Sequence, residues 1–244
     1  MANRICTILI TGAGSGLGRG LCRHFASAGH TVLAGDINLA AAKETVAGTT
    51  ATALTLDVTS AVSLDAPVDV LINNAGVQHV ARLEEFPEAK WEQLIDIMLT
   101  GTARATRAVL PGMRQRGFGR IINIGSIHSL VASPFKSAYV AAKHGLLGFA
   151  KTVALETADV DITINTICPS YIRTPLVDGQ IAAQAKTHGI SEEEVIQRIM
   201  LEPMPKKAFI TVEEVAGTIE FLMSDAARNI TGQTITIDGG WTAR

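Results

Sequence analysis

The residues of this chain best suited to chemistry are Tyr139 and Lys143, four positions apart, with Ser126 thirteen residues upstream of the tyrosine. Positions i and i+4 of a helix lie on the same face, so the phenol and the ammonium can act as one unit. A free tyrosine has a pKa of about 10, and a nearby cation lowers that pKa by stabilising the phenolate. A serine hydroxyl can then hold a substrate oxygen while the tyrosine gives or takes its proton. The spacing predicts an acid–base site, although the pair alone also fits the polar face of an amphipathic helix.

A glycine-rich segment near the N-terminus predicts a dinucleotide site. The segment Thr11-Gly-Ala-Gly-Ser-Gly-Leu-Gly18 follows a short apolar run and precedes a helical pattern. Glycine lets the backbone turn sharply and approach a ligand closely, and the helix N-terminus behind it offers N–H donors to a pyrophosphate. A turn without a ligand would use similar residues, but the position between strand and helix favours the ligand site. The predicted contacts are Gly12, Ser15, Gly16, Leu17 and Gly18.

An aspartate at the end of the second apolar run predicts which dinucleotide binds. Asp36 lies twenty residues beyond Gly16, where a carboxylate can accept hydrogen bonds from both adenosine ribose hydroxyls. The same carboxylate would repel a 2′-phosphate, and the neighbouring Ile37 offers no basic group to bind one. We therefore expect NAD rather than NADP. Asp36 can also serve as the N-cap of the following helix.

Two further strand ends carry polar or small residues suited to the adenosine. Asp57 ends the third apolar run, where it can accept a hydrogen bond from the adenine amine or close a turn. The segment Asn73-Asn74-Ala-Gly76 ends the fourth run. Its amides can tie neighbouring strand ends together, and Gly76 leaves room for a ribose. A simple turn would use the same residue types.

Alternating strand and helix patterns predict one doubly wound α/β domain over residues 1–244, with a seven-stranded parallel sheet. Most predicted strands are continuous apolar runs, which is typical of parallel strands buried on both faces. They are Cys6–Thr11, Thr31–Asp36, Ala51–Asp57, Val68–Asn73, Arg120–Gly125, Thr163–Cys168 and Gln233–Asp238. The predicted helices are Leu17–Ala28, Leu39–Ala47, Glu88–Arg116, Ser137–Ala158, Leu176–Thr187, Ser191–Leu201 and Val212–Ser224.

Two segments interrupt this alternation. Residues 58–67 connect the third and fourth strands and are too few for a helix with its loops, so we expect a loop with at most one helical turn. That loop would leave the adenine side more open. Residues 175–207 form a long insertion, which we interpret as a lid over the substrate. A structural flap at an oligomer contact is the alternative.

Charge and cysteine content limit the classes of function. The net charge of −2 gives no electrostatic reason to expect nucleic acid or an anionic membrane as a partner. The longest apolar run falls short of the roughly 18 residues that span a bilayer, and the first residues lack the features of a signal peptide. Three scattered cysteines argue against disulfides or a metal cluster and suit a reducing compartment. We expect a cytoplasmic protein without a metal.

Taken together, these motifs resemble those of the short-chain dehydrogenases/reductases over essentially the whole chain. The order is Gly12-x-x-x-Gly16-x-Gly18, Asn73-Asn-Ala-Gly76, Ser126 and Tyr139-x-x-x-Lys143. The resemblance implies a Rossmann-type fold, hydride transfer with a nicotinamide, and a homotetramer. It also implies that Tyr139 is the acid–base, that Ser126 anchors the substrate oxygen, and that Lys143 lowers the tyrosine pKa and holds the nicotinamide ribose. Pro169 and Thr174 would also contact the cofactor, the threonine at the carboxamide.

Within that family the chain resembles the bacterial D-3-hydroxybutyrate dehydrogenases. The similar segments are Asn74-Ala-Gly-Val-Gln-His-Val80, Leu110-Pro-Gly-Met113, Leu130-Val-Ala-Ser133 and Lys136-Ser-Ala-Tyr-Val-Ala-Ala-Lys-His144. The resemblance implies a small hydroxy acid as substrate. Its carboxylate would be held by Gln78, His128, Lys136 and Gln180. One cation with neutral donors suits a small carboxylate, although Gln180 fits a surface amide equally well.

Three positions depart from the family pattern. Met98 stands where the family has an asparagine that holds a water of the proton relay, and a thioether is only a weak acceptor. Ser170 and Tyr171 replace a glycine and a tryptophan beside the nicotinamide and substrate, so Tyr171 is a further predicted substrate contact. These changes leave two alternatives: a dehydrogenase for another hydroxy acid or alcohol, and an NAD-binding protein with weak turnover.

Overall fold

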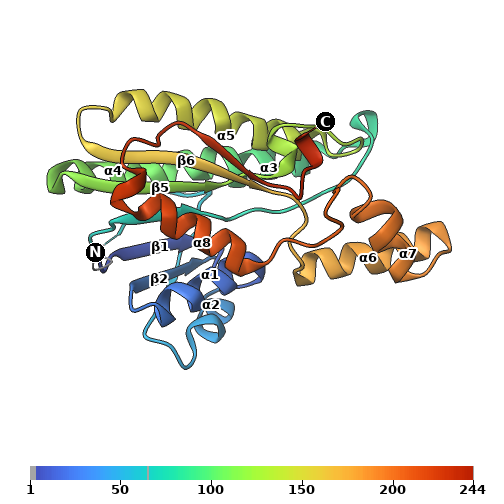
Figure 1. Ribbon diagram of the computed structural model, residues 1–244, viewed down its shortest axis with the longest axis horizontal. Helices are drawn as coiled ribbons and strands as arrows, with labels where there is room; N and C mark the ends of the chain where they lie inside the picture. Colours follow the sequence, from blue (N-terminus) through green and yellow to red (C-terminus); the bar gives the residue numbers. More distant parts are fainter. Residues whose placement is uncertain (1–3, 65, 244) are drawn as a thin grey trace.

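A computed structural model describes residues 4–64 and 66–243, and Figure 1 shows its arrangement of helices around one twisted sheet. The sheet has seven parallel strands in the order β3-β2-β1-β4-β5-β6-β7, which confirms the predicted fold class. The strands are β1 Thr7–Thr11, β2 Thr31–Asp36, β3 Thr52–Thr55, β4 Val70–Asn73, β5 Phe118–Ile124, β6 Asp161–Pro169 and β7 Thr234–Ile237.

The helices also follow the predicted pattern. They are α1 Gly16–Ser27, α2 Leu39–Val46, α3 Glu88–Ile95, α4 Gly101–Arg116, α5 Ser137–Glu156, α6 Pro175–His188, α7 Glu192–Val195 and α8 Val212–Met223. The single helix predicted over residues 88–116 is present as α3 and α4, joined by a wider π-helical turn at Asp96–Thr100. The described residues of the connection, 58–64 and 66–67, form a loop without a helix. None of the helices in the described residues is long and apolar enough to cross a bilayer.

Both faces of the sheet are buried because its strands carry apolar side chains in both directions. Successive side chains of a strand point to opposite faces. Ile8 and Ile10 of β1 pack with Phe25 of α1, whereas Leu9 packs with Val109 of α4. The helices α1 and α8 thus cover one face, and α4 and α5 cover the other (Figure 1).

The strand order reverses between β1 and β4, so the loops that follow these two strands diverge to opposite sides. Ligands of doubly wound sheets bind at this point, beyond the carboxyl ends of the strands. The insertion at residues 175–207, which contains α6 and α7, extends from the same region (Figure 1). It has an apolar cluster of its own, formed by Val177, Ile181, Val195 and Met200.

Candidate active site

One cavity of about 670 Å³ lies at the carboxyl ends of the strands, within the usual size range of ligand pockets. Its wall contains all but two of the predicted site residues: Gly12, Ser15, Gly16, Leu17, Asp36, Asp57, Asn74, Gly76, Gln78, Ser126, His128, Lys136, Tyr139, Lys143, Pro169, Tyr171 and Thr174. Gly18 is not part of the wall. Gln180 lies on α6, and its side chain is outside the described residues.

The glycine-rich loop forms a cradle that a larger side chain would fill. Gly12 and Gly16 have φ angles of 65° and 51°, in the left-handed region that favours glycine. A methyl group at Gly18 would collide with the carbonyl oxygen of Gly12, so Gly18 allows α1 to pack closely under the loop. Ser15 is the N-cap of α1, but its exposed side chain makes no capping hydrogen bond. These features fit the pyrophosphate of a dinucleotide.

Asn74 holds the glycine-rich loop against β4. Its side-chain nitrogen donates to the carbonyl oxygens of Thr11 at 3.0 Å and Gly12 at 3.1 Å. The adjacent Asn73 donates to Asn123 Oδ1 of β5 at 3.0 Å. The two amides therefore tie neighbouring strand ends together, as the sequence suggested.

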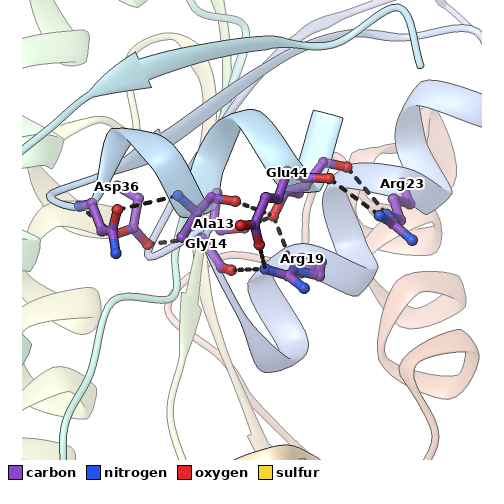
Figure 2. Close-up of polar contacts among 9 residues, drawn as sticks. Ala13, Gly14, Arg19, Arg23, Asp36 and Glu44 are labelled. Atoms are coloured by element: carbon purple, nitrogen blue, oxygen red, sulfur yellow. Dashed lines mark hydrogen bonds and ion pairs between the residues drawn. The ribbon is translucent and has the colours of Figure 1, made fainter. Parts of the chain in front are cut away.

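Asp36 is fixed by two backbone donors and still lines the cavity. Its Oδ2 accepts from Gly14 N at 2.7 Å (Figure 2), and its Oδ1 accepts from Asn38 N at 2.8 Å. Because each carboxylate oxygen can accept a second hydrogen bond, both remain able to accept from a ribose. The alternative that Asp36 caps α2 is wrong, since Asn38 is the N-cap and accepts from Ala41 N.

Asp57 closes a turn and also faces the cavity, so the predicted contact with the adenine amine stays a prediction. Its Oδ1 accepts from the backbone N–H of Thr59 at 2.8 Å and from the Thr59 hydroxyl at 2.7 Å, which closes a turn. Asp57 and Thr59 also line the cavity. The neighbouring Val58 carbonyl accepts from Arg104 of α4 at 3.2 Å, so the short loop is anchored to the helix behind it.

The acid–base residues come from the end of β5 and the start of α5. Ser126 caps a short 3-10 turn and accepts from His128 N at 3.1 Å, which fixes its hydroxyl. Tyr139 and Lys143 lie one turn apart on α5 and both face the cavity. The Lys143 ammonium lies 5.7 Å from the tyrosine ring centroid and donates to the carbonyl of Ile124 at 2.7 Å.

The titration of this pair differs from the expectation. Burial raises the pKa of Tyr139, and the interaction with the Ser126 side chain offsets only part of that effect. Burial also lowers the pKa of Lys143 to about 8. The net direction of the tyrosine shift is therefore opposite to the predicted lowering, because burial outweighs the other effects on the phenol. The ammonium is itself desolvated, and its shortest contact is with a carbonyl rather than with the phenol.

A testable consequence concerns stability against pH. Between the lowered pKa of about 8 and the usual value, the unfolded chain binds the Lys143 proton and the folded chain does not, so stability rises with pH. This effect amounts to about 2 kcal/mol between pH 8 and 9.5. Burial raises the pKa of all three cysteines, which acts in the opposite direction at high pH. Urea unfolding of the parent and of Lys143→Met isolates the lysine effect, and equal pH profiles for the two proteins would contradict it.

His128 and Lys136 form a site with one cation and one neutral donor. The Lys136 ammonium lies 3.5 Å from His128 Nε2, and the Ser133 hydroxyl lies 3.3 Å from the same nitrogen. Burial and the charge of Lys136 lower the pKa of His128 to about 4, so the imidazole is neutral at pH 7. Burial also lowers the pKa of Lys136. Gln78 lines the same cavity, and its Oε1 accepts from His79 N at 3.0 Å.

Behind two residues of the cavity wall, the structure adds an aromatic contact that we did not predict. Trp241 stacks on Tyr171 at 6.1 Å between centroids and meets the edge of His128 at 6.1 Å. The Tyr139 ring also meets His128 edge to face, at 6.2 Å between centroids. Trp241 follows a turn at Gly239 and Gly240, both with positive φ. The pair of glycines after the last strand was the available sequence signal. Unpredicted residues of the cavity wall include Ile37, Leu56, Val58, Thr59, Gln93, Asp96 and Ile97.

Met98 lies in the core rather than in the cavity wall. It is 1% exposed and packs in a cluster with Leu94, Ala138, Ala142 and the half-buried Tyr139. Its sulfur would lie 3.6 Å from a methyl group placed on Gly76. The side chain therefore fills the space between Gly76, on the cavity wall, and α5.

The fold and this site define a family. Residues 6–185 match the short chain dehydrogenase family, and the chain belongs to it. The protein is an oxidoreductase of a fold that binds nicotinamide dinucleotides.

Individual relatives agree with this assignment. The chain is 54% identical to a D-beta-hydroxybutyrate dehydrogenase of Rhizobium meliloti, over 72% of this chain and 68% of the relative. It is 42% identical to a D-beta-hydroxybutyrate dehydrogenase of Cupriavidus necator, over 98% of both chains. The crystal structure of an actinorhodin polyketide ketoreductase with NADPH superposes with a TM-score of 0.90 at 29% identity, covering 100% of this chain and 99% of that one.

Proposed function

We propose that the protein uses NAD to oxidise a small secondary alcohol, with D-3-hydroxybutyrate as the substrate and acetoacetate as the product. The observation that carries this proposal is that Ser126, Tyr139 and Lys143 share one cavity with His128 and Lys136. The first three residues suit proton transfer at a hydroxyl, and the other two suit a carboxylate. The similarity to the two D-beta-hydroxybutyrate dehydrogenases supports the choice of acid.

In this proposal the side chains divide the work between the two ends of the substrate. Lys136 and His128 hold the carboxylate with one charged and one neutral donor. Ser126 holds the reacting oxygen, and Tyr139 takes its proton in oxidation or returns it in reduction. Lys143 lies one turn beyond Tyr139, where its ammonium favours the phenolate as the proton leaves. When bound, the nicotinamide supplies the hydride acceptor.

A panel of hydroxy acids tests the proposal directly. The protein should form NADH with D-3-hydroxybutyrate faster than with its L enantiomer, with 2-hydroxybutyrate, or with 2-butanol. Faster turnover of another acid would show that this acid is the better substrate, and the proposed reaction class would stand. Normal NAD binding with no turnover of any alcohol would contradict the proposal and favour a binding protein.

The preference for NAD depends on the charge of Asp36. Replacing Asp36 with asparagine keeps an acceptor toward Gly14 but removes the charge that repels a 2′-phosphate. We expect kcat/KM with NAD to fall and kcat/KM with NADP to rise, each by about tenfold. Initial rates with both cofactors measure this change, and Asp57→Asn, at the adjacent strand end, is the matched control. An unchanged ratio would show that Asp36 does not select the cofactor.

The alternative with weak turnover is favoured by one observation, the buried Met98 in place of the family's asparagine. If a missing relay limits the rate, Met98→Asn should raise kcat several-fold. Burying an amide with few partners should also lower stability by about 1–3 kcal/mol. Met98→Leu conserves volume without adding a polar group and should leave kcat unchanged. An unchanged rate in Met98→Asn would show that this position does not limit turnover.

We also propose that the protein is a cytoplasmic homotetramer and that residues 175–207 act as a lid. The family resemblance supports the tetramer. The contribution of Val177 to the cavity wall supports the lid. Light scattering gives the mass of the assembly, and hydrogen exchange of α6 with and without NAD and acetoacetate tests closure.

A further inference from the structure

The first turn of α1 contains a cation whose position opposes the helix dipole. Arg19 is the fourth residue of α1, and the first turn has no acidic side chain. Positive charge near a helix N-terminus is unfavourable by a few tenths of a kcal/mol or more. It is favourable for an anion bound at that end. An arrangement that opposes a local preference is typical of functional positions.

The contacts of Arg19 link the glycine-rich loop to α2 (Figure 2). Its Nη2 donates to the carbonyl oxygen of Gly14 at 2.5 Å, and its Nε donates to Thr45 Oγ1 at 3.1 Å. The Thr45 hydroxyl is buried and donates to the carbonyl oxygen of Ala13 at 2.9 Å. The ion pair with Glu44 is longer, at 3.5 Å, and exposed, so it contributes little.

Gly14 is thus held on both sides. Asp36 accepts from its N–H, and Arg19 donates to its carbonyl oxygen. The fit is close, because a methyl group at Gly14 would lie 2.8 Å from Asp36 Oδ2 and 2.9 Å from the Ala41 methyl. A shift of the loop would therefore turn the carboxylate that faces the adenosine ribose.

We propose that Arg19 is a positioning residue of the dinucleotide site, which holds Gly14 and Asp36 in place and adds positive charge at the pyrophosphate end. This inference rests on the proposed function, because it assumes that NAD occupies the cavity. Arg19 lies outside the cavity wall and does not touch the reacting atoms. Its effect should therefore be confined to dinucleotide affinity.

Arg23 provides a matched control on the same helix. Its Nε donates to the carbonyl oxygen of Thr45 at 3.1 Å and its Nη2 to that of Glu44 at 3.3 Å. It thus joins α1 to α2 as Arg19 does, but none of its described hydrogen bonds reaches the glycine-rich loop (Figure 2). The two variants Arg19→Met and Arg23→Met remove the same charge from the same helix.

The experiment measures the NAD dissociation constant by calorimetry for the parent, Arg19→Met, Arg19→Lys and Arg23→Met. We expect Arg19→Met to bind about tenfold more weakly, as for one lost charge-assisted hydrogen bond. Its kcat at saturating NAD should stay close to that of the parent. Arg19→Lys should recover part of the affinity, because it restores the charge but not the fork of donors. Arg23→Met should bind NAD like the parent.

Equal affinity of Arg19→Met and the parent would overturn the inference, and so would equal losses in Arg19→Met and Arg23→Met. A loss of kcat without a loss of affinity would also contradict it. Thermal melts of the variants exclude general unfolding as the cause. If the parent itself fails to bind NAD, it is the proposed cofactor that is wrong, which separates that failure from a failure of the positioning role.

Discussion

Tyr139→Phe should lower kcat for a hydroxy acid by about 10²–10⁴-fold, the usual contribution of one acid–base group. The variant keeps the ring that meets the edge of His128 and loses only the phenol oxygen. NAD affinity should change by less than about twofold, because the phenol adds little to the binding of the whole dinucleotide. Single-turnover rates and NAD titrations separate the two effects.

The chain contains only one other tyrosine, Tyr171, and it lines the same cavity. Burial raises the pKa of its phenol as well. Tyr171→Phe should preserve the stacking on Trp241 and lose at most a few-fold in kcat. Activity of Tyr139→Phe equal to that of the parent would refute the mechanism, because Tyr139 is the residue to which the proposal assigns the proton.

Lys136→Met should lower kcat/KM for D-3-hydroxybutyrate by about 10–100-fold, the value of a hydrogen bond between charged partners. Turnover of 2-butanol, which has no carboxylate, should change little. The comparison therefore reports on the acid group rather than on the proton transfer. Lys151→Met, on the exposed side of α5, is the matched control.

A second readout of the same variant is the titration of His128. The charge of Lys136 is one cause of the low pKa of this histidine, so the pKa should rise when the charge is removed. NMR of the imidazole measures the shift. A parallel loss of activity on acid and neutral alcohols would show that Lys136 supports the fold of the loop rather than the carboxylate.

The strands and helices were predictable because each depends on a local pattern. Residues such as Ile8, Leu9 and Ile10 are apolar in succession, which is typical of a strand buried on both faces. The glycines at 12 and 16 have the positive φ that the loop requires. The cavity wall was predictable for the same reason, since strand ends of a doubly wound sheet meet at one edge.

What could not be predicted depends on contacts between distant segments. Trp241 reaches Tyr171 and His128 only after the last strand has joined the sheet. The direction of the shift in the Tyr139 pKa depends on how far the folded chain removes the phenol from water. A helix pattern also cannot reveal that Lys143 donates to the Ile124 carbonyl. Each of these requires knowledge of the packed structure.

The π-helical turn at Asp96–Thr100 joins α3 directly to α4. It rotates the apolar face of one helix relative to that of the other. A π-helical turn adds one residue to the winding, which offsets the apolar stripe of α3 from that of α4 by about 100°. Leu94 can therefore lie against α5 while Ala105 and Val109 lie against the sheet. Deleting a single residue here would restore even winding but swing one stripe toward solvent. A substitution in this turn, such as one at Met98, leaves the offset between the two stripes in place, whereas a deletion does not.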